Sequence, residues 1–212
     1  MEKPQIALVY EEDIDKKVFN TFIDIVSNEK LLLKTIPIEK GGPFAGMEWL
    51  VPTAIFAYVG KSYFDSFFKE MGKDHYQLLK KGFHSLWEKL VSPKSPQLVL
   101  VTGSSSPNKI IKDNPYSLYF SITAEAQNNL QFKLLIQKNC TFEIYQKTVD
   151  TFLDFLELYH NNKLDNDFID KMHNNSISRT ILVSYNIEKN MLNFITLENI
   201  KNNKSNKSLD DE

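Results

Sequence analysis

Several residue types that carry familiar chemistry are scarce in this chain of 212 residues. Its one cysteine, Cys140, excludes an internal disulfide and a zinc site built on cysteines. Its one arginine, Arg179, leaves few bidentate contacts to guanine or phosphate. The net charge of −2 provides no basic surface that would hold nucleic acid. We therefore expect a protein of a reducing cytoplasm that binds no nucleic acid.

Long apolar segments are also missing. The apolar, uncharged run at residues 49–60 is well short of the ~20 residues that a membrane-spanning helix needs. The N-terminal sequence MEKPQIALVY has neither the apolar core nor the cleavage site of a signal peptide. The sequence thus predicts a cytoplasmic protein without a membrane segment.

Glycine is scarce and unevenly distributed. Six of the 7 glycines, and both tryptophans, fall within residues 41–91. Glycine is costly in regular structure but favourable where the backbone turns sharply or approaches another group closely. We expect the most demanding backbone geometry, and with it a binding site, in this stretch.

The first half of the chain alternates between strand and helix patterns. Apolar residues at helical spacing predict helices at residues 11–26 and 61–91. Compact apolar runs predict strands at residues 5–10, 31–38, 53–59 and 97–102. This alternation is typical of a mainly parallel sheet with helices on both faces, as in TIR-like or flavodoxin-like α/β proteins.

The second half follows a different pattern. An amphipathic helix is predicted at residues 141–160, capped by Thr141, and a short helix at 164–172. Antiparallel pairs are predicted between 116–123 and 130–137 and between 179–187 and 191–197. We expect an α/β core (1–105), an antiparallel α+β extension (106–200) packed on the same domain, and a disordered polar tail (201–212).

The predicted topology places a ligand site at the carboxyl ends of the strands, where open parallel sheets bind ligands. The serines after Gly103 offer hydroxyls and free amides that suit a phosphate or ribose. The glycine-rich loop 41–46 allows two interpretations, a loop that closes over a ligand or a turn with special dihedral angles. The candidate ligand-binding residues are Tyr10, Gly41, Gly42, Phe44, Gly60, Lys61, Ser62, Tyr63, Gly103, Ser104 and Ser105.

Three familiar motifs are incomplete. The Gly60-Lys61-Ser62 triplet matches the end of a phosphate-binding P-loop, but that motif needs another glycine at position 55, where Ile55 stands in a predicted strand. The carboxylates and histidines of residues 61–91 show neither HExxH nor EF-hand spacing, so we expect a solvated helix face and no metal site. No G-x-S-x-G nucleophile motif is present.

Two segments resemble a TIR domain. IALVYEEDIDKKVFNTFIDIV is similar to the first strand and helix of that family, and AIFAYVGKSYFDSFFKEMG is similar to its third strand and following helix. The family's Tyr, Ser and Trp pattern falls on Tyr63, Ser66 and Phe68, and its mobile loop falls on 41–46. The resemblance covers roughly residues 5–105 and has no counterpart for the C-terminal half.

The resemblance implies two alternatives. Enzymatic TIR domains cleave NAD with a glutamate at the position of Gly72, and the nearest carboxylate, Glu70, comes two residues early. This offset turns it about 200° around an α-helix unless a local bulge restores it. In the catalytic alternative Glu70 is the catalytic carboxylate, Tyr10, Phe44 and Tyr63 stack on the substrate, and the serine loop meets the phosphates.

In the other alternative the chain is a non-catalytic module of a bacterial defence or signalling system. It binds a nucleotide, such as NAD, or a protein partner, and it requires no cofactor. The aromatic residues of the helix at Tyr63–Phe68 pack in the core by default. A helix that is apolar on several sides also suits a homo-oligomer interface.

Overall fold

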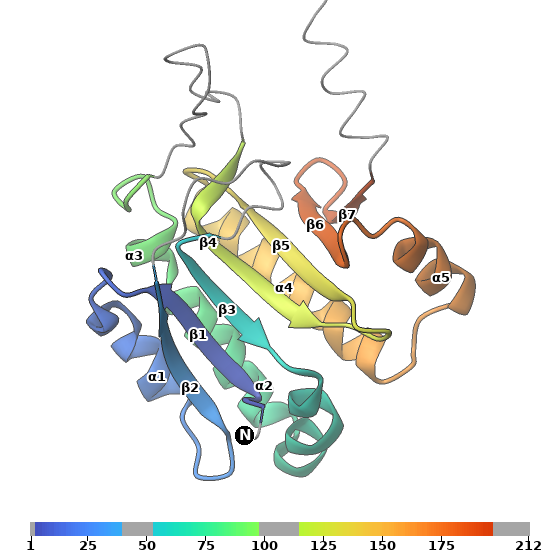
Figure 1. Cartoon of the computed structure of the whole chain (residues 1–212), viewed down its shortest axis with the longest axis horizontal. Coiled ribbons are helices and arrows are strands. Elements are labelled where there is room, and N and C mark those ends of the chain that lie inside the picture. Colours follow the sequence, from blue (N-terminus) through green and yellow to red (C-terminus); the bar gives the residue numbers. More distant parts are fainter. Residues whose placement is uncertain (1–2, 40–52, 98–114, 197–212) are drawn as a thin grey trace, which may run out of the picture.

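The computed structural model describes residues 3–39, 53–97 and 115–196, without the side chains of 66–72. Its strands form one sheet in the order β2-β1-β3-β4-β5-β6-β7 (Figure 1). The strands are β1 (Ile6–Glu11), β2 (Leu33–Ile38), β3 (Ile55–Val59), β4 (Tyr116–Glu125), β5 (Gln131–Gln137), β6 (Thr180–Asn186) and β7 (Met191–Ile195). The predicted C-terminal extension therefore continues the same sheet as the N-terminal half.

The helices at Phe142–His160 and Asn166–Asn174 begin at side-chain caps. The Thr141 side chain accepts a hydrogen bond from the Ile144 N–H, as predicted, and Asp165 accepts one from Phe168. None of the described helices is long and apolar enough to cross a membrane. The helices are η1 (Lys16–Phe19), α1 (Asn20–Val26), the π-helical segment η3 (Tyr63–Phe67), α2 (Phe68–Ser85), α3 (Trp87–Leu90), α4 (Phe142–His160) and α5 (Asn166–Asn174).

Strand direction alternates in pairs across the sheet. The pairs β1–β2, β3–β4 and β5–β6 are parallel, and each is joined through helices that supply the long crossover such pairs need. The pairs β1–β3, β4–β5 and β6–β7 are antiparallel. The α/β class is confirmed, but the prediction of a mainly parallel sheet is wrong because β3 runs opposite to its neighbour β1.

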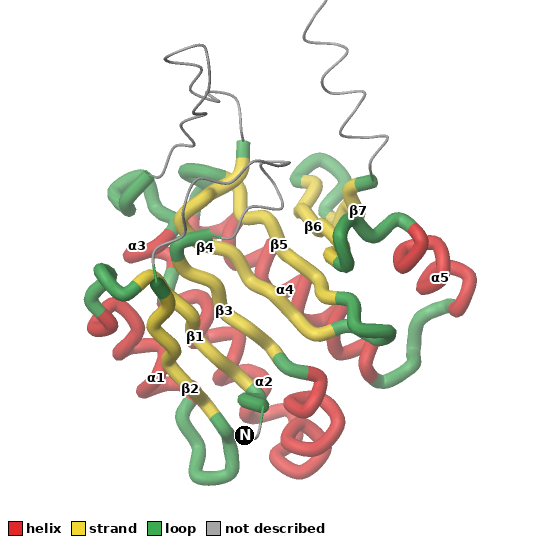
Figure 2. Tube along the Cα trace, viewed as in Figure 1, coloured by secondary structure: helices red, strands yellow, loops and turns green. Residues whose placement is uncertain are grey.

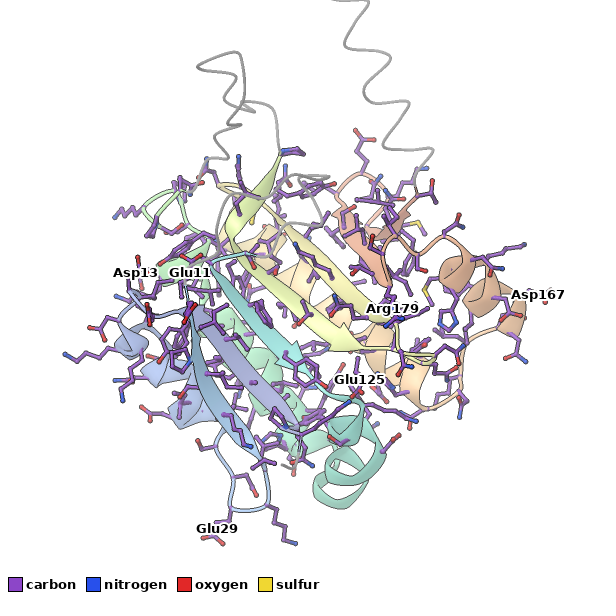
Figure 3. All side chains as sticks on the ribbon, viewed as in Figure 1. Glu11, Asp13, Glu29, Glu125, Asp167 and Arg179 are labelled. Atoms are coloured by element: carbon purple, nitrogen blue, oxygen red, sulfur yellow. The ribbon has the colours of Figure 1, made fainter. Side chains whose placement is uncertain are left out.

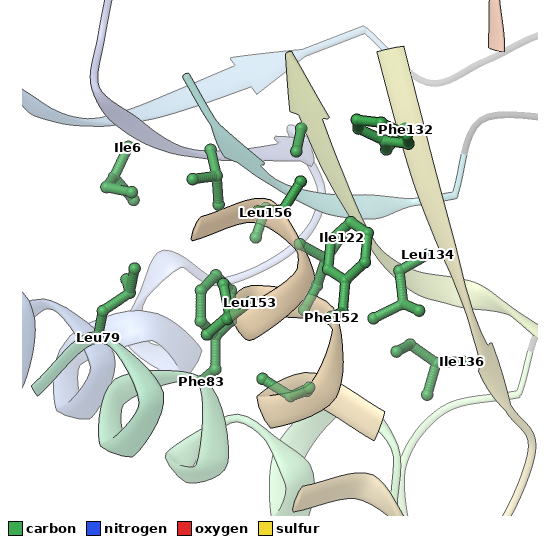
Figure 4. Packing of buried hydrophobic residues seen from close by; sticks show 14 of the residues in the cluster. Ile6, Leu79, Phe83, Ile122, Phe132, Leu134, Ile136, Phe152, Leu153 and Leu156 are labelled. Atoms are coloured by element: carbon green, nitrogen blue, oxygen red, sulfur yellow. The ribbon is translucent and has the colours of Figure 1, made fainter. Parts of the chain in front are cut away.

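The main core lies between the sheet and one layer of helices. Helices α1, α2 and α4 cover the same face of the sheet (Figures 1 and 2). Figure 4 shows Phe83 of α2 and Phe152 of α4 among the strand residues Ile122 and Leu134, all fully buried. The prediction of helices on both faces is therefore wrong for the described part of the chain.

Helices α1 and α2 approach each other closely at Gly82. A Cβ atom at this position would lie 2.3 Å from Val26 Cγ2 and 3.2 Å from the Phe22 ring. Because real Cβ atoms do not come so near to other carbons, only glycine allows this approach. Gly82 lies within residues 41–91, where the sequence predicts the most demanding backbone geometry.

A second, smaller apolar cluster lies on the other face of the sheet. Leu182 is fully buried there, and Leu135, Ile177 and Ile195 surround it. Strand side chains alternate between the two faces, so Leu182 and its partner Ile195 point away from the helix layer. The strands β5, β6 and β7 therefore pack on both faces.

Candidate functional site

Because strand direction alternates in pairs, some strands finish and others begin at each end of the sheet. At the first end, β1, β2, β5 and β6 finish and β3 and β4 begin, whereas β3 and β4 finish at the second end. Figure 3 shows Glu11 and Asp13 at the first end and Glu125 at the second. Tyr10 therefore lies at the opposite end from Gly60, and the prediction that their loops converge on one site is wrong.

The predicted residues at the second end have structural partners. The Gly60 N–H donates to the Gln5 carbonyl at 2.8 Å, and a Cβ at Gly60 would lie 2.9 Å from the Pro4 carbonyl oxygen. The Lys61 N–H donates to Glu125 Oε2 at 3.1 Å. Ser62 is half-buried one residue further on. Because Glu125 already supplies an anion to this helix start, the place that a phosphate would take is occupied.

Glu125 is the centre of this arrangement. Its carboxylate also accepts hydrogen bonds from Tyr58 Oη at 3.0 Å and Lys3 Nζ at 3.1 Å. Burial alone would raise the pKa of Glu125, but the bonds from Lys61 N–H, Lys3 and Tyr58 outweigh it and lower that pKa. The carboxylate is therefore a fixed anion that joins the N-terminal segment, β3 and the helix start.

Two aromatic residues predicted to stack on a substrate belong to the core. Tyr63 is fully buried, and its hydroxyl lies 3.2 Å from His75 Nδ1. His75 Nε2 in turn lies 2.9 Å from the Val26 carbonyl oxygen, and burial lowers the pKa of His75. Tyr10 packs against Phe19 with ring centroids 5.2 Å apart. Both predictions of substrate stacking are wrong, because both rings point into the helix layer.

Several candidate residues fall outside the structural description. Glu70 lies in the first turn of α2, but its side chain is not among those described. The π-helical segment η3 immediately precedes α2. A π-turn inserts a residue and changes the angular position of everything after it, so it is the kind of bulge that an active Glu70 would need. The residues Gly41, Gly42, Phe44, Gly103, Ser104 and Ser105 lie outside the described ranges.

His160, which the sequence did not single out, is buried near the second end. Its ring stacks on Phe64 at 4.8 Å, and neither ring nitrogen lies within hydrogen-bond distance and angle of a partner among the described residues. Burial lowers its pKa to about 4, since the opposing effect of the Asp65 carboxylate is weaker. His160 is therefore a buried, neutral ring among the described residues, and at 8% exposure it is not accessible to a substrate.

A groove of about 550 Å³ lies at the first end of the sheet. It lies beyond the carboxyl ends of β5 and β6, a parallel pair, which is where α/β sheets bind ligands. Its volume falls within the roughly 300–1,000 Å³ of small-molecule sites. The lining residues are Pro115, Tyr116, Leu135, Gln137, Thr148, Tyr185, Asn186, Ile187 and Glu188.

The polar groups in and beside the groove make hydrogen bonds within the protein. The Tyr185 hydroxyl donates to Asn190 Oδ1, and Asn186 Oδ1 accepts from the Lys189 N–H at 2.9 Å, so the turn beside the groove is fixed. The Thr148 hydroxyl donates to the Ile144 carbonyl oxygen. Among the described residues that line the groove there is no histidine, cysteine or lysine to act as base or nucleophile.

The first end also holds the points where two undescribed segments join the structure. Glu39 follows β2, Thr53 precedes β3 and Pro115 precedes β4. These residues flank the segments that contain the predicted glycine and serine loops. The groove was missed in the sequence because its two tyrosines, Tyr116 and Tyr185, were assigned to an extension and not to the sheet that carries the site.

Comparison with protein-family models, curated proteins and solved structures finds no match for this chain. The TIR-like resemblance therefore stays a prediction. Within the described ranges no group of three or more His, Cys, Asp or Glu side chains could hold a metal ion. The case for a function thus depends on the geometry of the sheet ends.

Proposed function

We propose that the protein is a non-catalytic binding module whose groove at the first end holds a ligand with a flat hydrogen-bonding ring, such as a nucleobase. The observation that carries the proposal is the position of the groove beyond the carboxyl ends of the parallel strands β5 and β6. A bacterial defence or signalling system is the biological setting that the TIR-like resemblance suggests for such a module.

The chemistry of the lining favours a ring over a free phosphate. Tyr116 and Tyr185 offer flat apolar faces with polar tips, which suit stacking. Gln137 and Asn186 carry amides that both donate and accept, and the Glu188 carboxylate accepts from an amino group. A purely anionic ligand would meet Glu188 without a lysine or arginine in the described lining to balance it.

The position of Glu70 favours binding over NAD cleavage. Helix α2 follows β3 through η3, so its first turn, with Glu70, lies near the second end of the sheet. Tyr10, its proposed partner in catalysis, lies at the first end and points into the core. A catalytic site that combines these residues with the groove would have to span the length of the strands.

Titration of the ¹⁵N-labelled protein with adenosine, uridine, NAD and inorganic phosphate tests the proposal. We expect the nucleosides or NAD, and not phosphate, to shift the amide resonances of Gln137 and residues 185–188. Tyr185→Ala should weaken binding about tenfold, in keeping with the ~1–3 kcal/mol that base–aromatic stacking contributes. Absence of any shift at millimolar ligand would refute the proposal.

A matched pair of variants on β5 provides the control. Gln137→Ala removes an amide that lines the groove, whereas Gln131→Ala removes the same side chain at the other end of the strand. Only Gln137→Ala should weaken binding. Nicotinamide release from NAD by the pure protein would instead support the hydrolase alternative.

A further inference from the structure

The two edge strands of the sheet differ in how well their sequences prevent pairing with a strand of another chain. On β2, Pro37 has no N–H to offer, and Lys34 adds a charge, both of which discourage pairing with another strand. At the opposite edge, β7 pairs only with β6 among the described strands. Its sequence MLNFI contains neither proline nor a charged residue. No described strand therefore pairs with the outer N–H and C=O groups of β7.

Apolar surface continues around β7. The Met191 side chain is 53% exposed. Phe168 of α5 lies edge-on to Phe194 at 5.5 Å and remains 39% exposed. Exposed apolar side chains beside an unprotected edge are typical of a surface that another chain covers.

We propose that two copies of the chain pair their β7 strands antiparallel about a two-fold axis at Asn193, which extends the sheet from one copy into the other. In this register Met191 faces Ile195 of the second copy, and Leu192 faces Phe194. Both pairs are apolar, and no charge is brought against a like charge. The proposal does not depend on the ligand groove.

Both faces of the sheet are consistent with this register. Ile195 belongs to the small cluster with Leu182, so Met191, Asn193 and Ile195 lie on that side. Leu192 and Phe194 pack against the main core on the other side. With a two-fold axis perpendicular to the sheet, the helix-covered face of one copy continues into the helix-covered face of the other. A shift of the pairing by one residue would instead join the helix-covered face of one copy to the opposite face of the other.

We choose a second copy as the partner because, in this register, the four apolar residues of β7 pair with one another on both sides of the sheet. The aromatic helix at Tyr63–Phe68 is a weaker candidate interface. Tyr63 is fully buried and Phe64 is only 1% exposed, so neither ring can face a partner.

Sedimentation velocity of the full chain between about 1 and 200 µM tests the proposal. The wild type should dimerise. Asn193→Lys and Asn193→Asp should each weaken the dimer about tenfold or more, because like charges then meet across the axis. An equimolar mixture of the two variants should dimerise again, since Lys then faces Asp.

Thr35→Lys, at an exposed position on the opposite edge strand β2, is the control and should dimerise like the wild type. The recovered dimer in the mixture shows that both variants are folded. A wild type that stays monomeric throughout the range overturns the proposal and leaves β7 to another partner. Dimerisation of Asn193→Lys alone at wild-type strength overturns it as well.

Discussion

Replacing His160 with phenylalanine should stabilise the protein, and more strongly at pH 5 than at pH 7.5. The imidazole is 8% exposed, and within residues 3–39, 53–97 and 115–196 neither nitrogen finds a hydrogen-bond partner. Leaving such a buried polar group unsatisfied costs about 1–3 kcal/mol. Phenylalanine has a similar shape and can keep the stacked contact with Phe64, so most of this cost should be recovered.

The pH dependence follows from the pKa of His160, which burial lowers from 6.5 to about 4. Between these values the unfolded chain binds a proton that the folded protein does not. The free energy of unfolding is therefore unaffected by this titration above about pH 6.5 and decreases as the pH falls towards 4. The full difference is ~3 kcal/mol, and about 2 kcal/mol of it is lost by pH 5.

Urea unfolding followed by circular dichroism at the two pH values measures both effects. His160→Gln separates them, because glutamine does not titrate but keeps a buried polar group. It should share the reduced pH dependence of His160→Phe without its gain at pH 7.5. If the difference in unfolding free energy between wild type and His160→Phe is the same at both pH values, His160 is not a buried neutral ring and the reasoning is refuted.

Two further predictions concern packing. Gly82→Ala should destabilise the protein by ~1–3 kcal/mol in urea unfolding, because the added carbon overlaps Val26 and this outweighs the higher helix propensity of alanine; an unchanged midpoint would mean that α1 and α2 are further apart. Burial raises the pKa of the Cys140 thiol to about 11, so an aromatic disulfide reagent at pH 8 should react with the native protein more than about 100-fold more slowly than with the unfolded chain. Equal rates would contradict the burial of Cys140.

The elements of the C-terminal half could be predicted because local patterns determine them. Residues 142–160 repeat apolar side chains at helical spacing after a capping threonine, and the strands 180–186 and 191–195 flank a short turn. Such patterns stay the same whatever the rest of the chain does.

Strand direction could not be predicted in the same way. The strand at residues 55–59 gives the same apolar pattern whether it runs parallel or antiparallel to β1, and this one choice moved Gly60 to the opposite end from Tyr10. The role of Tyr63 depends on His75 and on the carbonyl of Val26, a contact that no local pattern reveals. The groove likewise joins Tyr116 and Tyr185, which are far apart in the sequence.

The order of the strands in the sheet has a consequence for folding during synthesis. From β3 to β7 the spatial order of the sheet repeats the order of synthesis. Each new strand can therefore add to one already in place as the chain leaves the ribosome, without waiting for a distant partner. Of the described strands, β7 is the last to be synthesised. For the β7 pairing that we propose, a nascent chain would present this strand only after the other described strands have formed, which would limit association between chains on the same messenger RNA.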